Sequence, residues 1–342
     1  MRSHARTIVV LALAVGLVAL FLRNVDLGGV VDGILHARPE WLALSLATTF
    51  ANLAIRALRW QYLLQPLGRT TFANAFRATA VGFAANNLLP ARAGEVIRPY
   101  FLARHEQMSA TGAFATIILE RLLDTLTVLM LLASYVFLFG RDVAFTNPTG
   151  FKAVKWAGAS AAVLSMVALV VLFVLAKDPA RLGTTIERLA KVVPSALAAL
   201  ISKVAEKFAR GLGAIRQPSR LLLALAWSFP LWLSICLGIW SVAVAFRFEV
   251  PFTGSFLLLA LLVLGVAVPT PGAVGGFHVA FHFGATAFFG APDNAAAGAA
   301  IVLHLFSIGP SVFLGLVFAA QVGLNLNGIR RLSHQAEQGH TA

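Results

Sequence analysis

Charge is scarce in this sequence of 342 residues. Only 12% of the residues are charged, whereas 59% are hydrophobic, and the mean hydropathy is +0.83. A soluble globular domain carries about twice that share of charge, so the composition excludes one. No polar stretch is long enough for a separate soluble domain, and we expect a single membrane domain over residues 1–330. The remaining residues, 331–342, are predicted to form a disordered cytoplasmic tail.

Cysteine and the common catalytic motifs are also missing. Cys236 is the only cysteine, so no disulfide can form within the chain, and its apolar surroundings indicate a small core residue. No Walker loop, G-x-S-x-G elbow or dinucleotide fingerprint occurs, so ATP-driven transport and soluble-type hydrolysis have no sequence support. We predict no catalytic domain, no cofactor and no metal.

Acidic residues are few: 14 Asp and Glu stand against 27 Lys and Arg, a net charge of +13. Such a balance can indicate nucleic-acid binding. In a chain of this hydropathy it instead indicates cytoplasmic loops that face anionic lipid. The predicted partners are therefore membrane lipids and not nucleic acid, and the predicted location is the bacterial cytoplasmic (inner) membrane.

Apolar residues occur in runs long enough to cross a bilayer. Two stretches, 72–104 and 253–290, are apolar but broken near the middle by Pro and Gly, which is typical of re-entrant helices. The predicted fold is an all-α polytopic membrane protein with about six full transmembrane helices and two re-entrant hairpins. A span needs about 20 residues, and the six segments that qualify are 7–23, 41–63, 110–139, 151–176, 220–246 and 295–322.

The basic residues set the expected orientation. From Lys177 to Arg220 the chain carries nine basic and three acidic residues, so the linker 177–219 is predicted to be cytoplasmic, as are both termini. It joins two halves, 1–176 and 218–330. Apolar residues at helical spacing over 186–204 favour either an amphipathic helix on the inner leaflet or a helix that covers the end of the bundle.

The two broken segments resemble each other in sequence. Residues 90–94 (PARAG) align with residues 271–275 (PGAVG), and Ala115–Glu120 (ATIILE) aligns with Ala299–His304 (AAIVLH) after a three-residue shift. With six full spans and cytoplasmic termini, the first break opens from the cytoplasm and the second from outside. We therefore predict an inverted repeat whose breaks face each other near the midplane, around a central cavity.

Charged residues gather at the first break. One apolar half ends at Pro90, and the next helix begins near Gly94, whose free N–H groups and helix dipole favour an anion such as a lipid phosphate. Two arginines would strengthen this site, and a glutamate would neutralise one of them when the site is empty. The alternative is an interfacial loop whose charges extend to phosphates without a transport role. The binding residues predicted here are Asn87, Arg92, Glu95 and Arg98.

Two of the predicted spans also carry charge. Glu120 and Asp124, with Arg121 beside them, share one face of the span 110–139 by their spacing of four. Ionisable groups at such positions face protein or water. One acid would pair with Arg92 or Arg98, or Glu120 would exchange protons; a static ion pair between helices is the alternative.

The span 41–63 contains a second basic group. Arg56 lies deeper than Arg59 and is the candidate for a residue that lines the cavity. Arg59, near the cytoplasmic end, is expected to extend to the interface, and Trp60 is typical of an interface anchor.

The second break, Val268–Phe277 (VPTPGAVGGF), has no charge. Its prolines and glycines break a helix and allow close backbone approach, with freed backbone groups lining a cavity or bonding to neighbours. His278 and His282 are spaced like metal ligands, but no HExxH glutamate or cysteine accompanies them, so histidines satisfied at an extracellular interface are favoured over zinc. His304 aligns with Glu120. The predicted break residues are Pro90, Gly94, Pro269, Pro271, Gly272 and Gly275.

Four motifs in order resemble the lysylphosphatidylglycerol synthase transmembrane, or flippase-like, family over about residues 5–325. They are R-x-x-R-W at Arg56–Trp60, N-x-L-P-x-R-x-G-E-x-x-R at Asn87–Arg98, E-R-x-x-D at Glu120–Asp124 and P-x-P-G-x-x-G at Pro269–Gly275. The resemblance implies a protein similar to the flippase part of the bacterial multiple peptide resistance factor, which moves aminoacylated phosphatidylglycerol between leaflets through paired re-entrant helices. It carries over, as functional positions, Arg92, Glu95, Arg98, Glu120, Arg121 and Asp124.

The family's soluble aminoacyl-transferase domain has no counterpart in this sequence, so we do not expect the chain to make lysyl-lipid itself. The predicted function is translocation of a phospholipid or lipid-linked headgroup between leaflets. One alternative is a membrane-embedded transferase for a lipid-linked sugar or a polyprenyl or phospholipid substrate, with Glu120 or Asp124 as base or metal ligand. Another is a scaffold that holds lipid-biosynthesis enzymes together.

Overall fold

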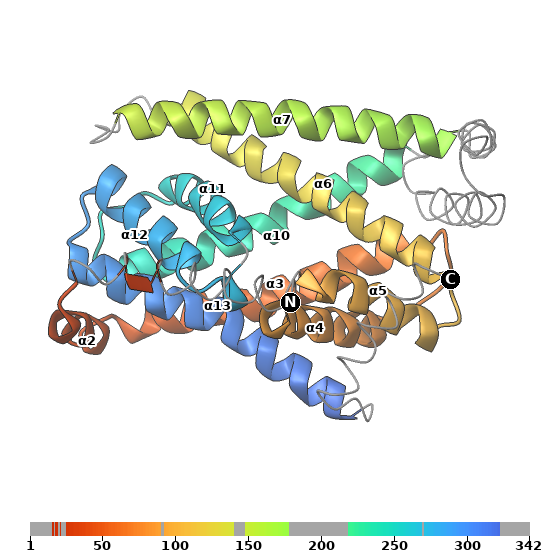
Figure 1. Cartoon of the computed structure of the whole chain (residues 1–342), viewed down its shortest axis with the longest axis horizontal. Helices are drawn as coiled ribbons and strands as arrows, with labels where there is room; N and C mark the ends of the chain where they lie inside the picture. The colour runs from red at the N-terminus through yellow and green to blue at the C-terminus, as the bar shows by residue number, and fades with distance from the viewer. Residues whose placement is uncertain are drawn as a thin grey trace, which may run out of the picture.

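The computed structural model describes residues 25–89, 92–139, 148–177, 218–268 and 270–321, together with residues 16, 18, 19 and 21. Every regular element in these ranges is helical, and the protein is an all-α polytopic membrane protein, as predicted (Figure 1). The elements are α2 (Leu27–Leu35), α3 (Pro39–Leu64), α4 (Phe72–Leu88), α5 (Gly94–His105), α6 (Ala110–Ser134), the π-helix η2 (Tyr135–Phe139), α7 (Pro148–Lys177), α10 (Pro218–Ala245), α11 (Gly254–Ala267), the 3-10 helix η5 (Pro271–Ala273), α12 (Gly276–Phe289) and α13 (Asp293–Gln321).

Four described helices are long and apolar enough to cross a membrane: α3, α6 with its π-helical end, α10 and α13. They coincide with four of the six predicted spans. A fifth, 151–176, falls within the 30 residues of α7, where Trp156–Val167 is apolar. The parts of the prediction that lie outside the described residues are nearly all of the span 7–23, the linker from 178 to 217, the tail 331–342, and Pro90 and Pro269.

The two broken segments form helical hairpins that are too short to span the bilayer. At 1.5 Å per residue, α4 is about 26 Å long, α5 about 18 Å, and α11 and α12 about 21 Å each, against a hydrocarbon core of about 30 Å. Within each pair the helices pack on each other, α4 on α5 and α11 on α12. Both pairs are therefore re-entrant.

Glycines let the two helices of each hairpin touch backbone to backbone. A Cβ atom on Gly94, the first residue of α5, would collide with the carbonyl oxygen of Gly82 in α4. In the second hairpin, a Cβ atom on Gly276, the first residue of α12, would collide with the carbonyl oxygen of Gly265 in α11. The same close approach thus occurs at corresponding places in both hairpins.

The hairpins enter the bundle from opposite ends and meet at their tips. In Figure 1, α4 and α5 lie to the right and α11 and α12 to the left. The short helix η5, at the second tip, packs on α4. From the first tip, Arg92 Nη2 donates a hydrogen bond to the carbonyl oxygen of Val266 in α11, at 3.2 Å. The two predicted breaks therefore face each other.

The halves α3–α6 and α10–α13 repeat one order of elements: span, hairpin, span. α3 packs along α10, and in each half the second hairpin helix packs on the following span. Arg92 and Ala273, which the sequence alignment pairs, both have a left-handed backbone, with φ of 53° and 55°. This conformation is uncommon for residues other than glycine. The backbone of the two tips therefore agrees with the predicted repeat.

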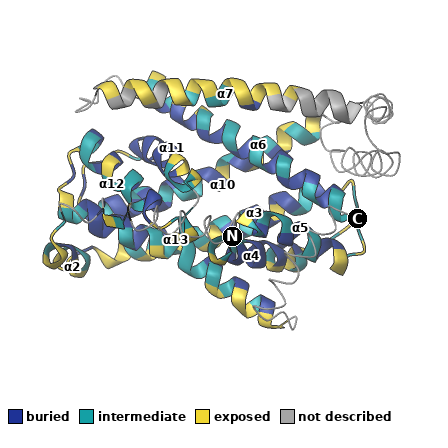
Figure 2. Cartoon of the chain, viewed as in Figure 1, coloured by how far each residue is buried: buried dark blue, intermediate teal, exposed yellow. Residues whose placement is uncertain are grey.

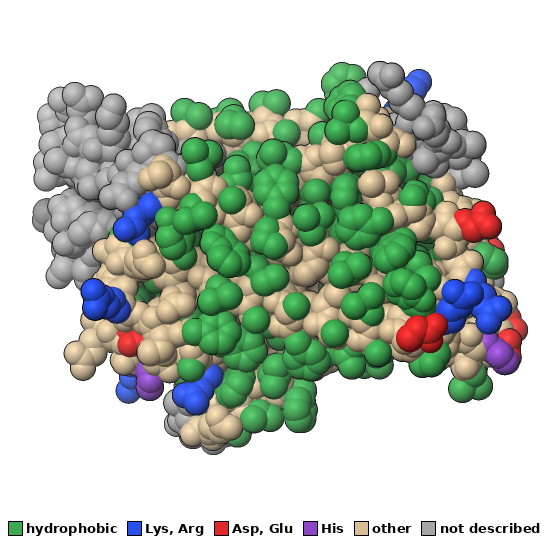
Figure 3. Space-filling model, turned by 180° about the vertical axis from the view of Figure 1, so that it is seen from behind, with side chains coloured by type: hydrophobic (Ala, Val, Ile, Leu, Met, Phe, Trp, Pro, Cys, Tyr) green, Lys and Arg blue, Asp and Glu red, His purple; other side chains and the backbone are tan. Residues whose placement is uncertain are grey.

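On the face drawn in Figure 3, apolar side chains form a belt between two charged ends. The charged side chains described where α3 ends and α4 begins, the basic end, are Arg69, Arg77, Arg104, Arg220 and Glu106. At the opposite, acidic end, five carboxylates outnumber three basic groups: Asp26, Asp32, Glu40, Glu249 and Asp293 against Arg38, Lys152 and Arg247.

Candidate functional site

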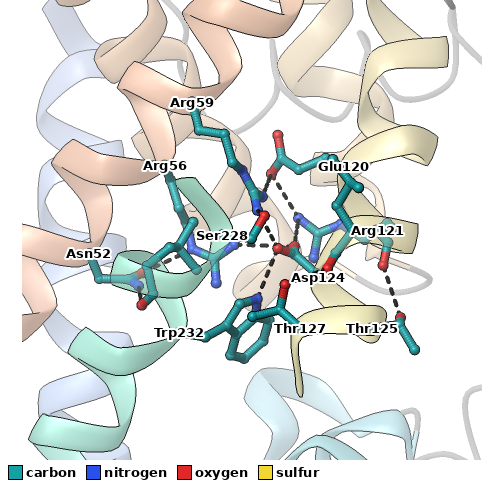
Figure 4. Close-up of polar contacts among 12 residues, drawn as sticks. Asn52, Arg56, Arg59, Glu120, Arg121, Asp124, Thr125, Thr127, Ser228 and Trp232 are labelled. Carbon is teal, nitrogen blue, oxygen red and sulfur yellow. Dashed lines mark hydrogen bonds and ion pairs between the residues drawn. The ribbon is translucent and has the colours of Figure 1, made fainter. Parts of the chain in front are cut away.

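Two carboxylates on α6 meet arginines inside the bundle (Figure 4). Glu120 and Asp124 lie one turn apart, so both side chains point to the same side of α6. Arg59 of α3 lies between them, with Nη1 2.6 Å from Asp124 Oδ1 and Nη2 3.3 Å from Glu120 Oε1. Arg59 Nη1 also donates to Ser228 Oγ of α10, at 2.7 Å, and the side chain is fully buried. These contacts compensate a charge that would otherwise be costly in this environment.

Arg98 joins this group from the first hairpin. Its Nη1 lies 3.1 Å from Glu120 Oε1, and its guanidinium carbon lies 3.9 Å from the ring centroid of Trp60, a favourable cation–π arrangement. Trp60 is fixed in turn by a hydrogen bond from Nε1 to Thr116 Oγ1, at 3.0 Å. Arg98 Nε and Nη2 are buried, and among the described residues they have no hydrogen-bond partner. Two strong donors are therefore available in a desolvated position.

Arg56 lies on the other side of Asp124. Its Nη1 is 3.6 Å from Asp124 Oδ2, and its Nε donates to Asn52 Oδ1 at 2.9 Å. The guanidinium lies 5.2 Å from the ring centroid of Phe83 on α4 and 5.5 Å from that of Trp232 on α10. Trp232 Nε1 donates to Asp124 Oδ1 at 3.0 Å. Helices α3, α4, α6 and α10 thus all contribute to the environment of this one carboxylate.

Arg121 and Glu95 form the accessible side of the group. Arg121 Nη2 lies 3.1 Å from Glu120 Oε1 and 3.6 Å from Asp124 Oδ2, and its Nε lies 3.9 Å from Glu95 Oε1. The side chains of Arg121 and Glu95 are 37% and 27% exposed, whereas those of Arg59 and Glu120 are not exposed at all. Arg121 and Glu95 are therefore the members of this group that solvent reaches most easily.

The charges of this group do not cancel. Four arginines stand against three carboxylates, which leaves one positive charge in excess when all are ionised. A buried excess charge interacts strongly with a counter-ion because the surroundings screen it poorly. Guanidinium groups offer paired N–H donors that match the oxygens of a phosphate or carboxylate. We name the group the arginine cluster: Arg56, Arg59, Glu95, Arg98, Glu120, Arg121 and Asp124.

The structure brings six of the predicted binding residues into the arginine cluster and leaves two out. Glu120 pairs with Arg98, one of the two arginines named for an acid of α6, and this contact is also an ion pair between helices α5 and α6. Arg92 lies exposed at the tip, where it bonds to α11. Asn87 turns its side chain back and donates to a backbone carbonyl of its own helix, at 2.9 Å. The six are Arg56, Glu95, Arg98, Glu120, Arg121 and Asp124.

Two interpretations of α3 are wrong. Arg59 does not extend to the interface and Trp60 is not an interface anchor, because both side chains are completely buried. The reason is that α3 continues as far as Leu64, and Arg220 Nη1 of α10 donates to Gln65 Oε1 just beyond it, at 3.1 Å. Arg59 and Trp60 therefore lie inside the bundle.

The sequence contains a signal for the position of Arg59 and Trp60 that the hydropathy pattern does not show. On α10, Ser228 and Trp232 are four residues apart and so share one face, and both bond to the arginine cluster. The acids of α6 have the same spacing, as do Arg56 and Trp60 on α3. Polar or aromatic groups at this spacing on three separate spans indicate three faces that meet.

The break residues described in the structure mark helix ends. Gly94 begins α5 and Pro271 begins η5. Gly272 and Gly275 have φ of 59° and 88°, which glycine adopts without strain. The backbone therefore breaks where it was expected to.

Three histidines of the second half make contacts within or next to its hairpin. His304 Nε2 donates to the carbonyl oxygen of Gly272 at 2.8 Å, and its ring centroid lies 4.5 Å from that of His278. His282 Nε2 lies 3.3 Å from Asp293 Oδ1 at the acidic end. Within the described residues no three His, Cys, Asp or Glu side chains are grouped as metal ligands would be.

The family described as the lysylphosphatidylglycerol synthase TM region matches residues 7–315, nearly the whole chain. The chain belongs to this family. Its membership ties the protein to lipid handling in a membrane, and the motifs that carried the resemblance include all seven residues of the arginine cluster.

Two archaeal relatives are named UPF0104 membrane proteins. The one from Methanocaldococcus jannaschii is 27% identical over 135 residues, which cover 39% of this chain and 38% of the relative. The one from Methanothermobacter thermautotrophicus is 31% identical over 126 residues, which cover 36% and 37%. The chain thus matches little more than a third of each relative's length. Their names agree with a membrane protein and state no activity.

Proposed function

We propose that the protein is a lipid translocase that binds the anionic headgroup of a phospholipid or lipid-linked substrate at the arginine cluster. The observation that carries this proposal is the pair of unused, buried donors on Arg98, in a cluster with one positive charge in excess. A phosphate diester presents two acceptor oxygens that fit such donors. Glu120 takes one side of Arg98 while the site is empty, and a bound phosphate would occupy the other.

The two opposed hairpins supply a route for alternating access. Each hairpin reaches the middle from one end only, and in this proposal the contact between the two tips is the barrier between the ends. Movement of one tip away from the other would open the arginine cluster to one side. The headgroup would enter from one surface, bind at the cluster and leave to the other surface, so that each opening exposes about half of its path. Its acyl chains would remain in lipid.

We assign the basic end to the cytoplasm, because positively charged loops are retained on that side. The first hairpin then opens from the cytoplasm and its uncharged partner shapes the exit on the outside. Both termini are placed in the cytoplasm on the same argument.

The excess charge also implies a choice of headgroup. A lipid with a net negative headgroup would neutralise the cluster, whereas an aminoacylated lipid with a net positive headgroup would meet a like charge at Arg121. We therefore expect phosphatidylglycerol to be a better substrate than its lysyl ester.

Reconstitution in liposomes tests this function. Fluorescent phosphatidylglycerol is placed in both leaflets, and its exposure to a membrane-impermeant quencher is followed with time. Arg98→Gln should slow translocation by roughly tenfold, equivalent to about 1.4 kcal/mol of lost headgroup interaction. The matched control is Arg77→Gln, an exposed arginine on α4 outside the cluster, which should translocate like the wild type.

Other results would overturn the proposal. Equal rates for both variants would show that the cluster does not bind the headgroup. A covalently altered lipid in the mass spectrum of the same liposomes would favour the transferase, with Glu120 or Asp124 as its base. If the protein neither moves nor alters any lipid, the remaining alternative is a scaffold for lipid-biosynthesis enzymes.

A further inference from the structure

An apolar groove lies on the side of the bundle, apart from the arginine cluster. It has a volume of about 410 Å³ and lies between α6, α7 and α10. Its walls include Leu126 and Met130 of α6, Ala162 and Met166 of α7, and Leu222 and Leu225 of α10. All of its lining residues are leucine, methionine or alanine.

The groove is present because α7 packs along α6 and not along α10. At Gly158 an added Cβ atom would lie 3.0 Å from Leu132 Cδ2, so α7 and α6 come very close there. Among the described helices, α7 has its main packing on α6, and it lies at the outside of the molecule with many exposed residues (Figure 2). Among the described helices α7 does not pack closely on α10, and the groove lies between them.

The groove is open sideways to the bilayer. Leu222, Met166 and Met130 on its rim are 66%, 52% and 49% exposed. An empty apolar space loses dispersion contacts on one side, and water gains no partners in it. Since α6 and α10 are long and apolar enough to cross a membrane, we expect the groove to open onto hydrocarbon. Its volume is in the range of small-molecule sites, about 300–1,000 Å³.

The charge beside the groove shows which leaflet its occupant comes from. Leu221, also in the lining, is the neighbour of Arg220 in the first turn of α10. Arg220 belongs to the basic end of the molecule, where phosphate groups of lipid are favoured. A lipid with its phosphate near this end would direct an acyl chain along the groove.

The groove is separate from the proposed headgroup site. Its back is a buried apolar layer that includes Leu63, Leu119, Leu123 and Ala224, and no residue of the arginine cluster lines it. We infer that the groove is a second lipid site, which holds one acyl chain of a phospholipid from the leaflet at the basic end and thereby joins α7 to α10. This bound lipid is a resident part of the fold and is not the transported molecule.

Photolabelling tests the inference on the full chain in liposomes. The probe is phosphatidylglycerol with a diazirine in the middle of one acyl chain, and labelled peptides are identified by mass spectrometry. We expect label on residues 162–166 and 221–225. Ala162→Phe, which fills the groove, should lower that label by roughly tenfold. The matched control Val163→Phe, on a side chain that is 63% exposed and outside the lining, should leave it unchanged.

A second variant, Ala133→Phe, fills the groove from α6 and guards against misfolding of the first. Equal labelling of wild type, Ala162→Phe and Ala133→Phe, or label spread evenly over the exposed faces of α7 and α13, would overturn the inference. Both lipid sites can fail independently, because Arg98→Gln should slow translocation by roughly tenfold and leave the groove label intact.

Discussion

The two hairpins have one backbone design and two chemistries. Both cross at a glycine pair, and both tips contain a left-handed residue, Arg92 in the first and Ala273 in the second. The first hairpin and the span after it contribute Arg98 and Glu120 to a charged cluster. At the corresponding place in the second half, His304 of α13 forms a hydrogen bond with the backbone carbonyl of Gly272. The two halves therefore agree in backbone shape, whereas all seven residues of the arginine cluster come from the first half.

This difference gives the halves separate tasks in the proposed cycle. The charged hairpin would hold the headgroup, while the uncharged hairpin would act as a wall that moves. A headgroup that bound equally to both hairpins would gain nothing from crossing between them. Because only one of the two similar halves is charged, the proposed substrate would have a single binding site, the arginine cluster.

The largest expected effect concerns what the hairpins share. Gly94→Ala and Gly276→Ala each place a Cβ atom against a backbone carbonyl that cannot yield cheaply, so each should lower the free energy of unfolding by about 3 kcal/mol. Thermal unfolding in detergent measures the loss. The control is Gly309→Ala in α13, where the nearest neighbour is a leucine side chain at 3.6 Å. Stability like that of the control would show that the backbone contacts are not tight.

The next effect concerns how the hairpins differ. Glu120→Gln removes a negative charge beside Arg98 and so raises the positive excess of the cluster; an anionic lipid should bind more tightly by roughly tenfold, about 1.4 kcal/mol, and leave more slowly. His304→Gln, at the aligned position, keeps a donor for Gly272 and should not change headgroup binding. Titration with a soluble short-chain phosphatidylglycerol distinguishes the two, and similar shifts in both variants would mean that the halves share the task.

A smaller effect concerns the contact between the tips. Arg92→Ala removes the hydrogen bond to the Val266 carbonyl and should destabilise the tip contact by about 1 kcal/mol. Hydrogen exchange of residues 264–268 should become faster, with Arg77→Ala as the control. Headgroup affinity should not change, because Arg92 lies outside the arginine cluster; a lower affinity would place Arg92 back in the binding site.

The smallest effect is expected at Glu106, which follows the end of α5 at the base of the first hairpin. Burial opposes ionisation of Glu106, but hydrogen bonds from Thr70 and Asn74 outweigh it, and its pKa lies below the usual 4.5. A carboxylate with a lowered pKa stabilises the folded state above its ordinary pKa and loses that contribution as the pH falls through the folded value. Glu106→Gln should therefore be less stable than wild type by under about 1 kcal/mol at neutral pH.

The pH dependence provides the check on Glu106. The difference in melting temperature between wild type and Glu106→Gln should shrink as the pH falls below 4.5. A difference that stays constant down to low pH would mean that the hydrogen bonds do not depend on the charge.

The sequence predicted the helical frame well, because its signals are local. Apolar runs have the length of a span, and Pro and Gly stop helices wherever they gather. The pairing of the two breaks also followed from a short alignment. What it did not show is how each helix is turned about its own axis, since spans that are apolar all round reveal little about which face is inside.

That missing rotation explains the errors at the site. Arg59 bonds to Asp124 and Ser228, which lie 65 and 169 positions away, so no local pattern reveals the contacts. The same is true of Trp60 beneath Arg98. Glu120 and Arg98 were matched correctly as one of two options because only a few charges were available to pair.

The glycine crossings have a mechanical consequence. At Gly94 and Gly276 the two helices of each hairpin meet backbone to backbone, so no side chains lie between them at these crossings to slide or repack. Each hairpin should therefore swing as a stiff lever, with the bending confined to its base. Gly290, with φ of 64° and open space around it, follows the end of α12 at the base of the second hairpin, where we expect such bending. The amplitude of movement of the second hairpin would then be set by the loop at Gly290 and not by bending within α11 or α12.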